Sequence, residues 1–500
     1  MSRRDKSAAA PVTETGAMAE HFDVLIIGAG LSGIGAAWRL QQQRPGASYA
    51  VLEARSAIGG TWDLFRYPGV RSDSDMFTLS YPFRPWQGDR SLASGESIRR
   101  YIQDTADEGG ITPHIRFSAR VVAADWTADH WTVRLAGGET LTCAFLYACA
   151  GYYDYAGGHQ PDFAGLEDYT GRFVHPQSWP ADLDYAGRRV VVIGSGATAV
   201  TLVPAMAGTA AHVTMLQRSP SYLTVLPGRD VVADLLRRRL PARVAHKVAR
   251  AKNILLTQGF YQLARRRPER VKALLRRFAV QHLADAAYVD EHFTPTYQPW
   301  DQRLCVIPDA DLFEAIKAGA ASVVTDHIDR FVPEGIRLRS GRTLEADVVV
   351  SATGLSLLPI GGVTLTVDGR PVDPGRHVAY RGVMLSSVPN FAYCIGYTNA
   401  SWTLRADLSH RYVCRLLSYL DRTGYVAATP KETPGNRRPL LDLSSGYVQR
   451  ALDRFPQQGD KDPWTVRQNY LLDVLTTPRA DVRRDMTFSR STAPVLEEIR

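Results

Sequence analysis

Two glycine-rich turns constrain the fold of this chain more than any other feature. The first, GAGLSG at residues 28–33, follows the apolar run 22–27, and the second, GSGATA at residues 194–199, follows the apolar run 189–193. A strand that runs through such a turn into a helix brings the helix N-terminus to a dinucleotide pyrophosphate. We therefore predict an α/β fold with two Rossmann-like dinucleotide-binding domains in this chain of 500 residues.

The residues that follow each turn indicate which dinucleotide it binds. Glu53 ends the next apolar run and lies 20 residues after Gly33, where a carboxylate accepts the hydroxyls of a ribose. After the second turn this place is taken by Arg218, and a guanidinium can pair with a 2′-phosphate that a carboxylate would repel. The pair of sites predicts FAD in the first domain and NADPH in the second, with hydride passing from nicotinamide to flavin.

The order of apolar runs predicts that both domains are interrupted. Between about 225 and 300, apolar residues recur at helical spacing among clustered arginines, which indicates a helical insert. A helical stretch from about 404 to 420 is predicted to return the chain to the first domain, and the proline- and charge-rich residues 427–440 to form a surface loop. The predicted divisions are a disordered leader at 1–20, an FAD-binding domain at 21–155 and 380–490, an NADP-binding domain at 156–224 and 300–379, and the helical insert at 225–299.

Positive charge is concentrated in the predicted insert. The net charge is +8, yet residues 236–277 contain 14 Lys and Arg and only one acidic residue, Glu269. This segment alone therefore carries +13 and the remainder about −5. A solvated helical face is the favoured interpretation, an anionic membrane surface is the second, and contact with nucleic acid is the third and is not expected.

Cysteine usage and hydropathy indicate a cytoplasmic protein. The chain has five cysteines and no C-x-x-C pair, so we expect neither a disulfide scaffold nor a metal site, and a disulfide reductase is excluded. No apolar run reaches the ~18 residues needed to span a membrane, and the first 20 residues lack the apolar core of a signal peptide. Membrane association through 236–277 remains open.

Two longer motifs point to a family. Residues 59–73, GGTWDLFRYPGVRSD, match a fingerprint of the class B, type I Baeyer–Villiger flavin monooxygenases, and residues 169–180, YTGRFVHPQSWP, resemble their second fingerprint with Tyr169 in place of Phe. From about residue 23 to 494 the chain resembles a mycobacterial branch of this family, through RYPGVRSDSDM, VVIGSGATAVTLVPA, PWDQRLC and GYTNASWTL. The resemblance implies an NADPH-dependent enzyme that uses FAD and O2, through a C4a-peroxyflavin, to convert ketones to esters or lactones and sulfides to sulfoxides.

The resemblance also assigns roles to individual residues. Arg303, which follows the insert, is expected to stabilise the negative charge of the oxygen-transfer step, and Asp73 to orient it. Gln302 stands where many relatives carry a lysine that helps to hold NADPH. His175 is predicted to be structural, a linker histidine that hydrogen-bonds backbone. Cofactor contacts are expected at Gly28, Gly30, Ser32, Gly33, Glu53, Gly60, Thr61, Trp62, Asp63, Leu64, Gly69, Val70, Arg71, Asp73, Val121, Gly194, Ser195, Gly196, Ala197, Thr198, Ala199, Val200, Arg218 and Ser219.

Alternative functions are compatible with the same motifs. A dedicated sulfoxidase or N-hydroxylating monooxygenase would use the same two nucleotide sites, and an uncoupled enzyme would act as an NADPH oxidase. A flavoprotein that serves as a membrane-binding module is the non-enzymatic alternative, based on the charge of residues 236–277. The intact fingerprints and Arg303 favour the Baeyer–Villiger interpretation.

Overall fold

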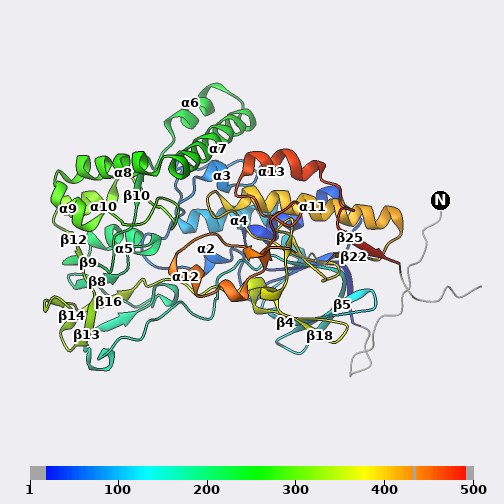
Figure 1. The fold of residues 1–500 in the computed structure, drawn as a ribbon, viewed down its shortest axis with the longest axis horizontal. Coiled ribbons are helices and arrows are strands. Elements are labelled where there is room, and N and C mark those ends of the chain that lie inside the picture. The colour runs from blue at the N-terminus through cyan, green and yellow to red at the C-terminus, as the bar shows by residue number, and fades with distance from the viewer. Residues whose placement is uncertain (1–18, 432–434, 491–500) are drawn as a thin grey trace, which may run out of the picture.

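The computed structural model describes residues 19–431 and 435–490 and contains two large sheets, four smaller ones and a helical region (Figure 1). The larger sheet has the central order β18-β17-β4-β5-β6-β1-β2-β3. Strands β1, β2 and β6 run parallel, with Ile27 aligned to Leu52 on one side and to Ala148 on the other. Its strands are β1 (His21–Ile27), β2 (Tyr49–Leu52), β3 (Ile115–Arg116), β4 (Val121–Thr127), β5 (His130–Leu135), β6 (Thr140–Ala148), β17 (Thr364–Val367), β18 (Arg370–Val372), and the attached β19 (Ala379–Tyr380), β20 (Met384–Leu385) and β21 (Phe391–Tyr393).

The second sheet is parallel throughout and has the order β12-β9-β8-β16-β7. Its central strands β8 and β16 are almost uninterrupted runs of Val and Ile, as expected where both faces are covered. Two separate nucleotide-binding folds are thereby confirmed. The strands are β12 (Ala321–Thr325), β9 (His212–Gln217), β8 (Arg189–Ile193), β16 (Val348–Ser351) and β7 (Arg172–Val174), flanked by α5 (Ala197–Ala207), α10 (Asp311–Lys317) and the hairpins of β13 (Ile328–Val332), β14 (Gly335–Leu338) and β15 (Thr343–Glu345).

The predicted helical insert is present and is anchored at both ends. It leaves the second domain after β10 (Leu223–Leu226) and returns at β11 (Cys305–Pro308), and these two strands pair in parallel. The helices of the insert are α6 (Val231–Arg239), α7 (Ala242–Arg266), α8 (Pro268–Leu283) and α9 (Ala286–His292). Helices α6 and α7 project along the upper edge of the molecule in Figure 1.

The C-terminal part completes the larger sheet, but it does so earlier than the sequence predicted. Strands β17 and β18 were expected in the NADP domain, since its second segment was placed at 300–379, whereas β17 pairs with β4 of the larger sheet. The short pattern around residues 364–372 predicts a hairpin and carries no information about which sheet receives it.

Two further predictions concern the C-terminal part. The predicted helix is α11 (Trp402–Thr423), which ends at Gly424 with φ of 71° and packs on α1 (Leu31–Gln43). The surface loop predicted at 427–440 is wrong at its start, because β22 (Ala427–Pro430) pairs with β25 (Met486–Ser489) and is mostly buried. Part of this loop, residues 432–434, lies outside the described residues, as does most of the predicted leader, residues 1–18.

The remaining elements are short except for α4, which has 14 residues. The helices are α2 (Thr61–Leu64), α3 (Met76–Leu79), α4 (Gly95–Glu108), α12 (Gly446–Gln449) and α13 (Tyr470–Thr476), and the strands are β23 (Arg438–Pro439) and β24 (Gln457–Gln458). Among the described residues no helix is both long and apolar enough to cross a bilayer.

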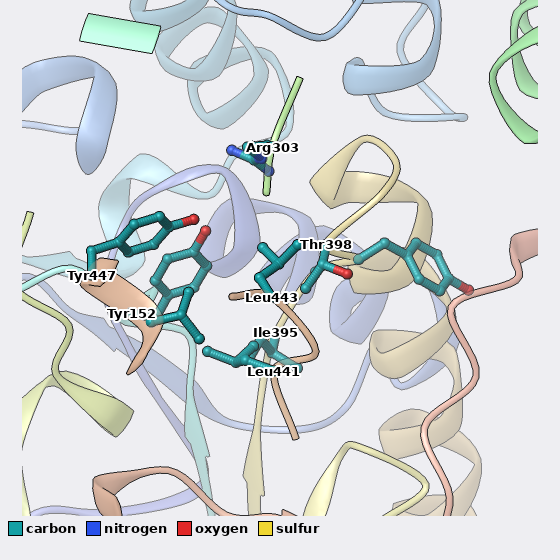
Figure 2. Close-up of a pocket in the computed structure, with 10 residues that line it drawn as sticks. Tyr152, Arg303, Ile395, Thr398, Leu441, Leu443 and Tyr447 are labelled. Atoms are coloured by element: carbon teal, nitrogen blue, oxygen red, sulfur yellow. The ribbon is translucent and has the colours of Figure 1, made fainter. Parts of the chain in front are cut away.

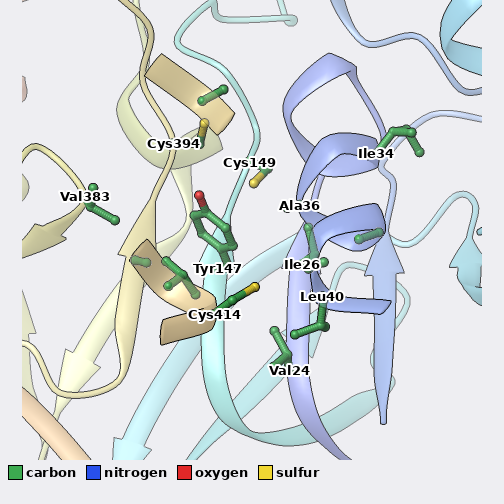
Figure 3. Packing of buried hydrophobic residues seen from close by; sticks show 14 of the residues in the cluster. Val24, Ile26, Ile34, Ala36, Leu40, Tyr147, Cys149, Val383, Cys394 and Cys414 are labelled. Atoms are coloured by element: carbon green, nitrogen blue, oxygen red, sulfur yellow. The ribbon is translucent and has the colours of Figure 1, made fainter. Parts of the chain in front are cut away.

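The core of the first domain lies between its sheet and helices α1 and α11. Val24, Ile26, Leu40 and Tyr147 pack together there with three cysteines (Figure 3). All five cysteines are buried and free. The Cys149 and Cys394 sulfurs and the His410 ring lie within 4.8 Å of one another, and the His410 Nδ1 lies 2.8 Å from the Tyr147 hydroxyl. Burial lowers the pKa of His410 to about 3, so the imidazole is neutral and acts as a core hydrogen-bonding group.

Candidate active site

The first glycine turn forms a narrow backbone-lined cradle. Gly28 has φ of 99°, and a Cβ on Gly33 would lie 1.8 Å from the Gly28 carbonyl oxygen, so only glycine fits at either place. Gly30 faces Gly60, with 3.4 Å between a Cβ placed on Gly30 and the Gly60 Cα. Helix α1 has no side-chain cap, which leaves its first N–H groups available. The lining therefore fits the pyrophosphate of a dinucleotide.

Glu53 lies where the sequence placed it, directly after β2 and beside the glycine turn. Its Oε2 accepts a hydrogen bond from the Ala29 N–H at 2.7 Å, and its Oε1 accepts one from the Arg55 N–H at 2.8 Å. Burial raises the pKa of Glu53 above its ordinary value. Each carboxylate oxygen can accept a further hydrogen bond, so the side chain can brace the turn and also receive a ribose hydroxyl.

The first fingerprint closes the cradle at residues 59–64. Gly59 and Gly60 have φ of 137° and 57° and lead into α2. The Thr61 hydroxyl lies 3.3 Å from that of Tyr155, and the buried Asp63 carboxylate accepts hydrogen bonds from Arg55 at 2.7 Å and Arg66 at 2.5 Å. Two guanidiniums therefore lie next to the cradle, which suits an anionic ligand.

Other residues of the expected cofactor set lie at the domain boundary or in the core. A Cβ on Gly69 would lie 2.6 Å from that of Ala205 on α5, and Arg71 forms an ion pair with Asp311 of α10. The Ser32 hydroxyl accepts a hydrogen bond from the Trp402 indole at 2.7 Å. Val121 is buried at the start of β4. Gly69 and Arg71 thus hold the two domains together, a role that the linear motif does not reveal.

The second glycine turn is built like the first. Gly194 has φ of 132°, and a Cβ there would lie 2.4 Å from the Ala352 carbonyl oxygen, whereas a Cβ on Gly196 would meet open space. Helix α5 begins after Gly196 without a side-chain cap. The buried Ala199 takes the third place of the motif. The open side of Gly196 and the free helix terminus fit a second pyrophosphate.

Arg218 lies beside this turn with its charge unneutralised. It follows β9, and the Ser195 hydroxyl lies 3.3 Å from the Ser219 carbonyl oxygen and 2.8 Å from the Ser221 hydroxyl. Arg218 is exposed, and its side chain makes no hydrogen bond or ion pair with another residue in 19–431 or 435–490. A guanidinium at this position is free to bind a phosphate on the adenosine ribose.

Arg303 lines a cavity (Figure 2) and also contacts Asp73. Arg303 Nη1 lies 3.8 Å from Asp73 Oδ2, although the two residues are 230 positions apart. Asp75, and not Asp73, caps α3. The cavity has about 320 Å³ of space not filled by protein atoms, part of which is open to solvent, and it is lined by Tyr152, Arg303, Ile395, Gly396, Tyr397, Thr398, Leu441, Leu443, Tyr447 and Val448.

The cavity places one cation among apolar and aromatic groups. Figure 2 shows the Tyr152 and Tyr447 hydroxyls directed toward Arg303. The Asp73 carboxylate raises the pKa of Arg303 further above its ordinary value, and burial raises the pKa values of Tyr152 and Tyr447. Arg303 is therefore a permanent cation and the tyrosines are neutral hydrogen-bond donors. The cavity suits an apolar molecule with one oxygen that gains negative charge.

Neither Tyr152 nor Tyr447, two tyrosines of the cavity, was predicted from the sequence. Tyr152 follows β6 at the carboxyl end of a parallel strand, where ligands bind in such sheets, so its position carried a usable signal. Tyr447 lies on α12, far along the chain, and nothing local marks it. Ser444 of the same segment donates backbone and side-chain hydrogen bonds to the Asp301 carbonyl, which connects this segment to Arg303.

His175 is structural, as predicted. Its Nδ1 accepts a hydrogen bond from the Gln177 N–H at 3.2 Å, and its Nε2 lies 3.4 Å from the Gly354 carbonyl oxygen. Burial lowers the pKa of His175, which favours the neutral ring with one accepting and one donating nitrogen. The histidine therefore ties the linker to the end of the second sheet.

Known proteins share both the sequence and the fold. Residues 26–89 match the NAD(P)-binding Rossmann-like domain, and residues 76–234 match the family described as flavin-binding monooxygenase-like. The FAD-containing monooxygenase EthA of Mycobacterium tuberculosis is 50% identical over 488 residues, which covers 96% of this chain and 100% of that protein.

Solved structures agree with this assignment at the level of the fold. An oxidised steroid monooxygenase bound to NADP has a TM-score of 0.73 at 22% identity and covers 94% of this chain and 100% of its own. A complex of OTEMO with FAD and NADP has a TM-score of 0.68 at 22% identity, with coverage of 83% and 87%.

Proposed function

This chain belongs to the family of FAD-containing monooxygenases that includes EthA, and from this premise we propose that it is an NADPH-dependent Baeyer–Villiger monooxygenase. Its proposed substrates are O2 and a small ketone, which becomes an ester or lactone, or a sulfide, which becomes a sulfoxide. The observation that carries the proposal is the contact of Arg303 with Asp73 at the wall of an apolar cavity. The glycine cradles of the two domains support FAD and NADPH as cofactors.

Bound FAD, once reduced by NADPH, supplies the two-electron activation of O2. The residues of the chain would bind the cofactors, orient them and stabilise the negative charge that develops. The turns at Gly30 and Gly196 would hold the pyrophosphates at helix N-termini, and Arg303 would stabilise the negative charge that develops on oxygen during its transfer to the substrate. Asp73 would keep the guanidinium in place beside the largely apolar lining of the cavity.

Product analysis tests the proposed reaction. The FAD-loaded protein is given NADPH and O2 with a panel of cyclic ketones and thioethers, and esters, lactones, sulfoxides and hydrogen peroxide are quantified against NADPH consumed. Ester or lactone is expected in near-stoichiometric yield with at least one ketone. Sulfoxide or N-oxide without any ester would indicate the dedicated sulfoxidase or N-hydroxylase, and peroxide alone would indicate an NADPH oxidase.

Cofactor preference provides a second test. Arg218→Ala is expected to raise the KM for NADPH while leaving that for NADH almost unchanged, because the lost charged contact is worth ~1.5–3 kcal/mol, roughly a 10- to 150-fold effect. Stopped-flow reduction of FAD by each nucleotide measures the ratio. The matched control is Arg188→Ala. Arg188 is also exposed, and it lies just before β8, at the end of that strand away from the glycine turn. An unchanged NADPH/NADH ratio in the Arg218 variant would remove this residue from the site.

We also propose a cytoplasmic location. The support is that all five cysteines are buried free thiols, which is usual in a reducing compartment. Fractionation of the native host, with the protein detected by antibody, would test this location.

A further inference from the structure

The exposed apolar side chains of this protein are concentrated on one side. Most of the large hydrophobic residues that are exposed among the described residues lie on α6, on α7, between them, or on α13, and these three helices lie along the upper edge of Figure 1. We call this surface the apical face. Its apolar members are Val231, Val232, Leu235, Leu240, Val244, Val248, Leu255, Leu256, Leu263, Leu471, Leu472 and Leu475.

Helix α7 is apolar on its outer side as well as its inner side. Val244, Val248 and Leu255 follow one another at intervals of four and seven residues, so they form one stripe along the helix, and each is at least 44% exposed. The inner side packs through Ala245, Ala249 and Ile254, which are buried. A helix of a soluble domain normally needs only the inner stripe, so the outer one requires a separate explanation.

The helical insert that carries the outer stripe also carries cations without partners. Several arginines of the insert are engaged inside the protein, such as Arg250, which donates to the Phe77 and Ser80 carbonyls. Others make no side-chain hydrogen bond or ion pair with any residue of the described part of the chain. These are Arg238, Arg239, Arg243, Lys247, Arg266, Arg267, Arg270 and Arg277. Since Glu269 is the only acidic residue in 236–277, the positive charge is not cancelled locally.

A single layer of side chains, which includes Tyr397, lies between the helices of the apical face and the cavity. Ile254 of α7 packs with Tyr397 and Tyr470, and Tyr470 begins α13. The Tyr397 hydroxyl donates to the Asp473 carboxylate of α13 at 2.7 Å, and Tyr397 also lines the cavity. The two helices that carry outward leucines therefore hold a wall of the cavity on their inner sides.

We propose that the apical face docks on an anionic lipid bilayer. An interfacial amphipathic surface inserts its leucines at the level of the headgroups while its arginines pair with acidic lipids. Both features occur in this helical region, where 236–277 holds only one acidic residue, and this combination favours a bilayer over an apolar protein partner. The proposal extends to the substrate, a ketone or sulfide dissolved in the bilayer, and this second part rests on the proposed function.

Vesicle sedimentation tests the docking. The FAD-loaded full chain is mixed with phosphatidylcholine vesicles that contain half phosphatidylglycerol, and with pure phosphatidylcholine vesicles. Sedimentation with the anionic vesicles is expected, reduced at least tenfold in Leu255→Ser/Leu256→Ser. The matched control is Phe117→Ser/Val122→Ser, two exposed apolar residues at and before β4 on the opposite side, which should bind like the wild type. Wild-type protein left in the supernatant, or equal binding by the Leu255/Leu256 variant, would overturn the proposal.

The oligomeric state distinguishes the bilayer from a second copy of the chain. Sedimentation velocity without lipid is expected to give the same mass for the wild type and for the Leu255/Leu256 variant. A wild-type dimer that this variant converts to a monomer, without anionic vesicle binding, would assign the apical face to self-association and refute lipid docking.

Supplying the ketone either in vesicles or in water tests the second part of the proposal, that the substrate comes from the bilayer. A long-chain 2-ketone dissolved in the anionic vesicles is compared with a short water-soluble ketone. The Leu255/Leu256 variant is expected to lose at least tenfold in rate on the vesicle-dissolved ketone and to keep its rate on the soluble one. Equal rates of the wild type and this variant on the vesicle-dissolved ketone would overturn the proposed delivery of substrate from the bilayer. Vesicle binding without turnover of either ketone would contradict the proposed function and leave docking intact.

Discussion

Replacing Arg303 with alanine is expected to abolish oxygen transfer while leaving the reduction of FAD by NADPH intact. Arg303 is the only cationic residue that lines the described cavity, where it lies 3.8 Å from Asp73. Hydride transfer needs the nicotinamide stacked on the flavin and creates no oxyanion in this cavity. Oxygen insertion does create one, and it loses its fixed positive partner in the variant.

The size of this effect follows from the surroundings of the charge. Tyr152, Tyr447 and the leucines around Arg303 keep the dielectric low, so water replaces the missing cation poorly. A preorganised donor of this type is worth ~3 kcal/mol or more, which is about a hundredfold or greater in rate. Electrons already delivered to FAD are then expected to leave as hydrogen peroxide.

Parallel measurement of the two half-reactions checks this result. Stopped-flow absorbance follows the reduction of FAD, and product analysis follows ester, sulfoxide and peroxide. Arg229→Ala, a surface arginine paired with Asp89, serves as the matched control and should retain full oxygenation. Arg303→Lys keeps the positive charge but lacks the planar guanidinium, so it should retain part of the oxygenation that Arg303→Ala loses. Near wild-type oxygenation by Arg303→Ala would show that the cation acts from another residue.

The nucleotide-binding parts of the fold were predictable because their signals are local. A glycine with positive φ, the helix that follows it and the side chain at the end of the next strand all lie within about 25 residues of one another, as in Gly28 to Glu53. The same applies to Gly194 and Arg218. Each feature reflects a steric or electrostatic requirement of the turn itself.

Features that depend on distant parts of the chain were predicted only through family resemblance or were missed. Arg303 and Asp73 come from different segments, and no spacing rule joins them. Tyr447 contributes to the cavity because Ser444 of its segment bonds to Asp301, a contact that follows from the tertiary fold alone. The placement of β17 in the larger sheet has the same origin.

The insert shows a different limit of sequence patterns. The helical spacing of Leu235, Leu236, Leu240, Val244 and Val248 was correctly taken as evidence for helices, and such residues are ordinarily assigned to a buried side. The structure exposes four of the five, with Leu235 at 47% and Val248 at 45%, and leaves Leu236 partly buried. Periodicity shows that apolar residues share a side of a helix, whereas only the tertiary arrangement shows what that side contacts.

Gly30→Val is expected to give a folded protein that does not retain FAD. Gly30 has φ of −83° and ψ of −169°, an extended conformation that valine adopts readily, so the backbone is not strained. A Cβ at this position has 3.4 Å to the Gly60 Cα and 3.8 Å to its nitrogen, so the protein itself accommodates the first atom. The valine methyl groups would occupy the space between the two glycine segments, which is the proposed place of the pyrophosphate.

Since the helix N-terminus and the turn act together on the pyrophosphate, displacing it is expected to weaken FAD binding by at least about a hundredfold, or ~3 kcal/mol. The flavin absorbance of the purified protein relative to its protein absorbance measures occupancy, and far-ultraviolet circular dichroism checks the fold. Gly46→Val makes the same chemical change where a Cβ has no neighbour within 4 Å, and it should retain FAD. Gly33→Ala should instead damage folding, because its Cβ would lie 1.8 Å from the Gly28 carbonyl oxygen. Full flavin occupancy in Gly30→Val would mean that the pyrophosphate lies elsewhere.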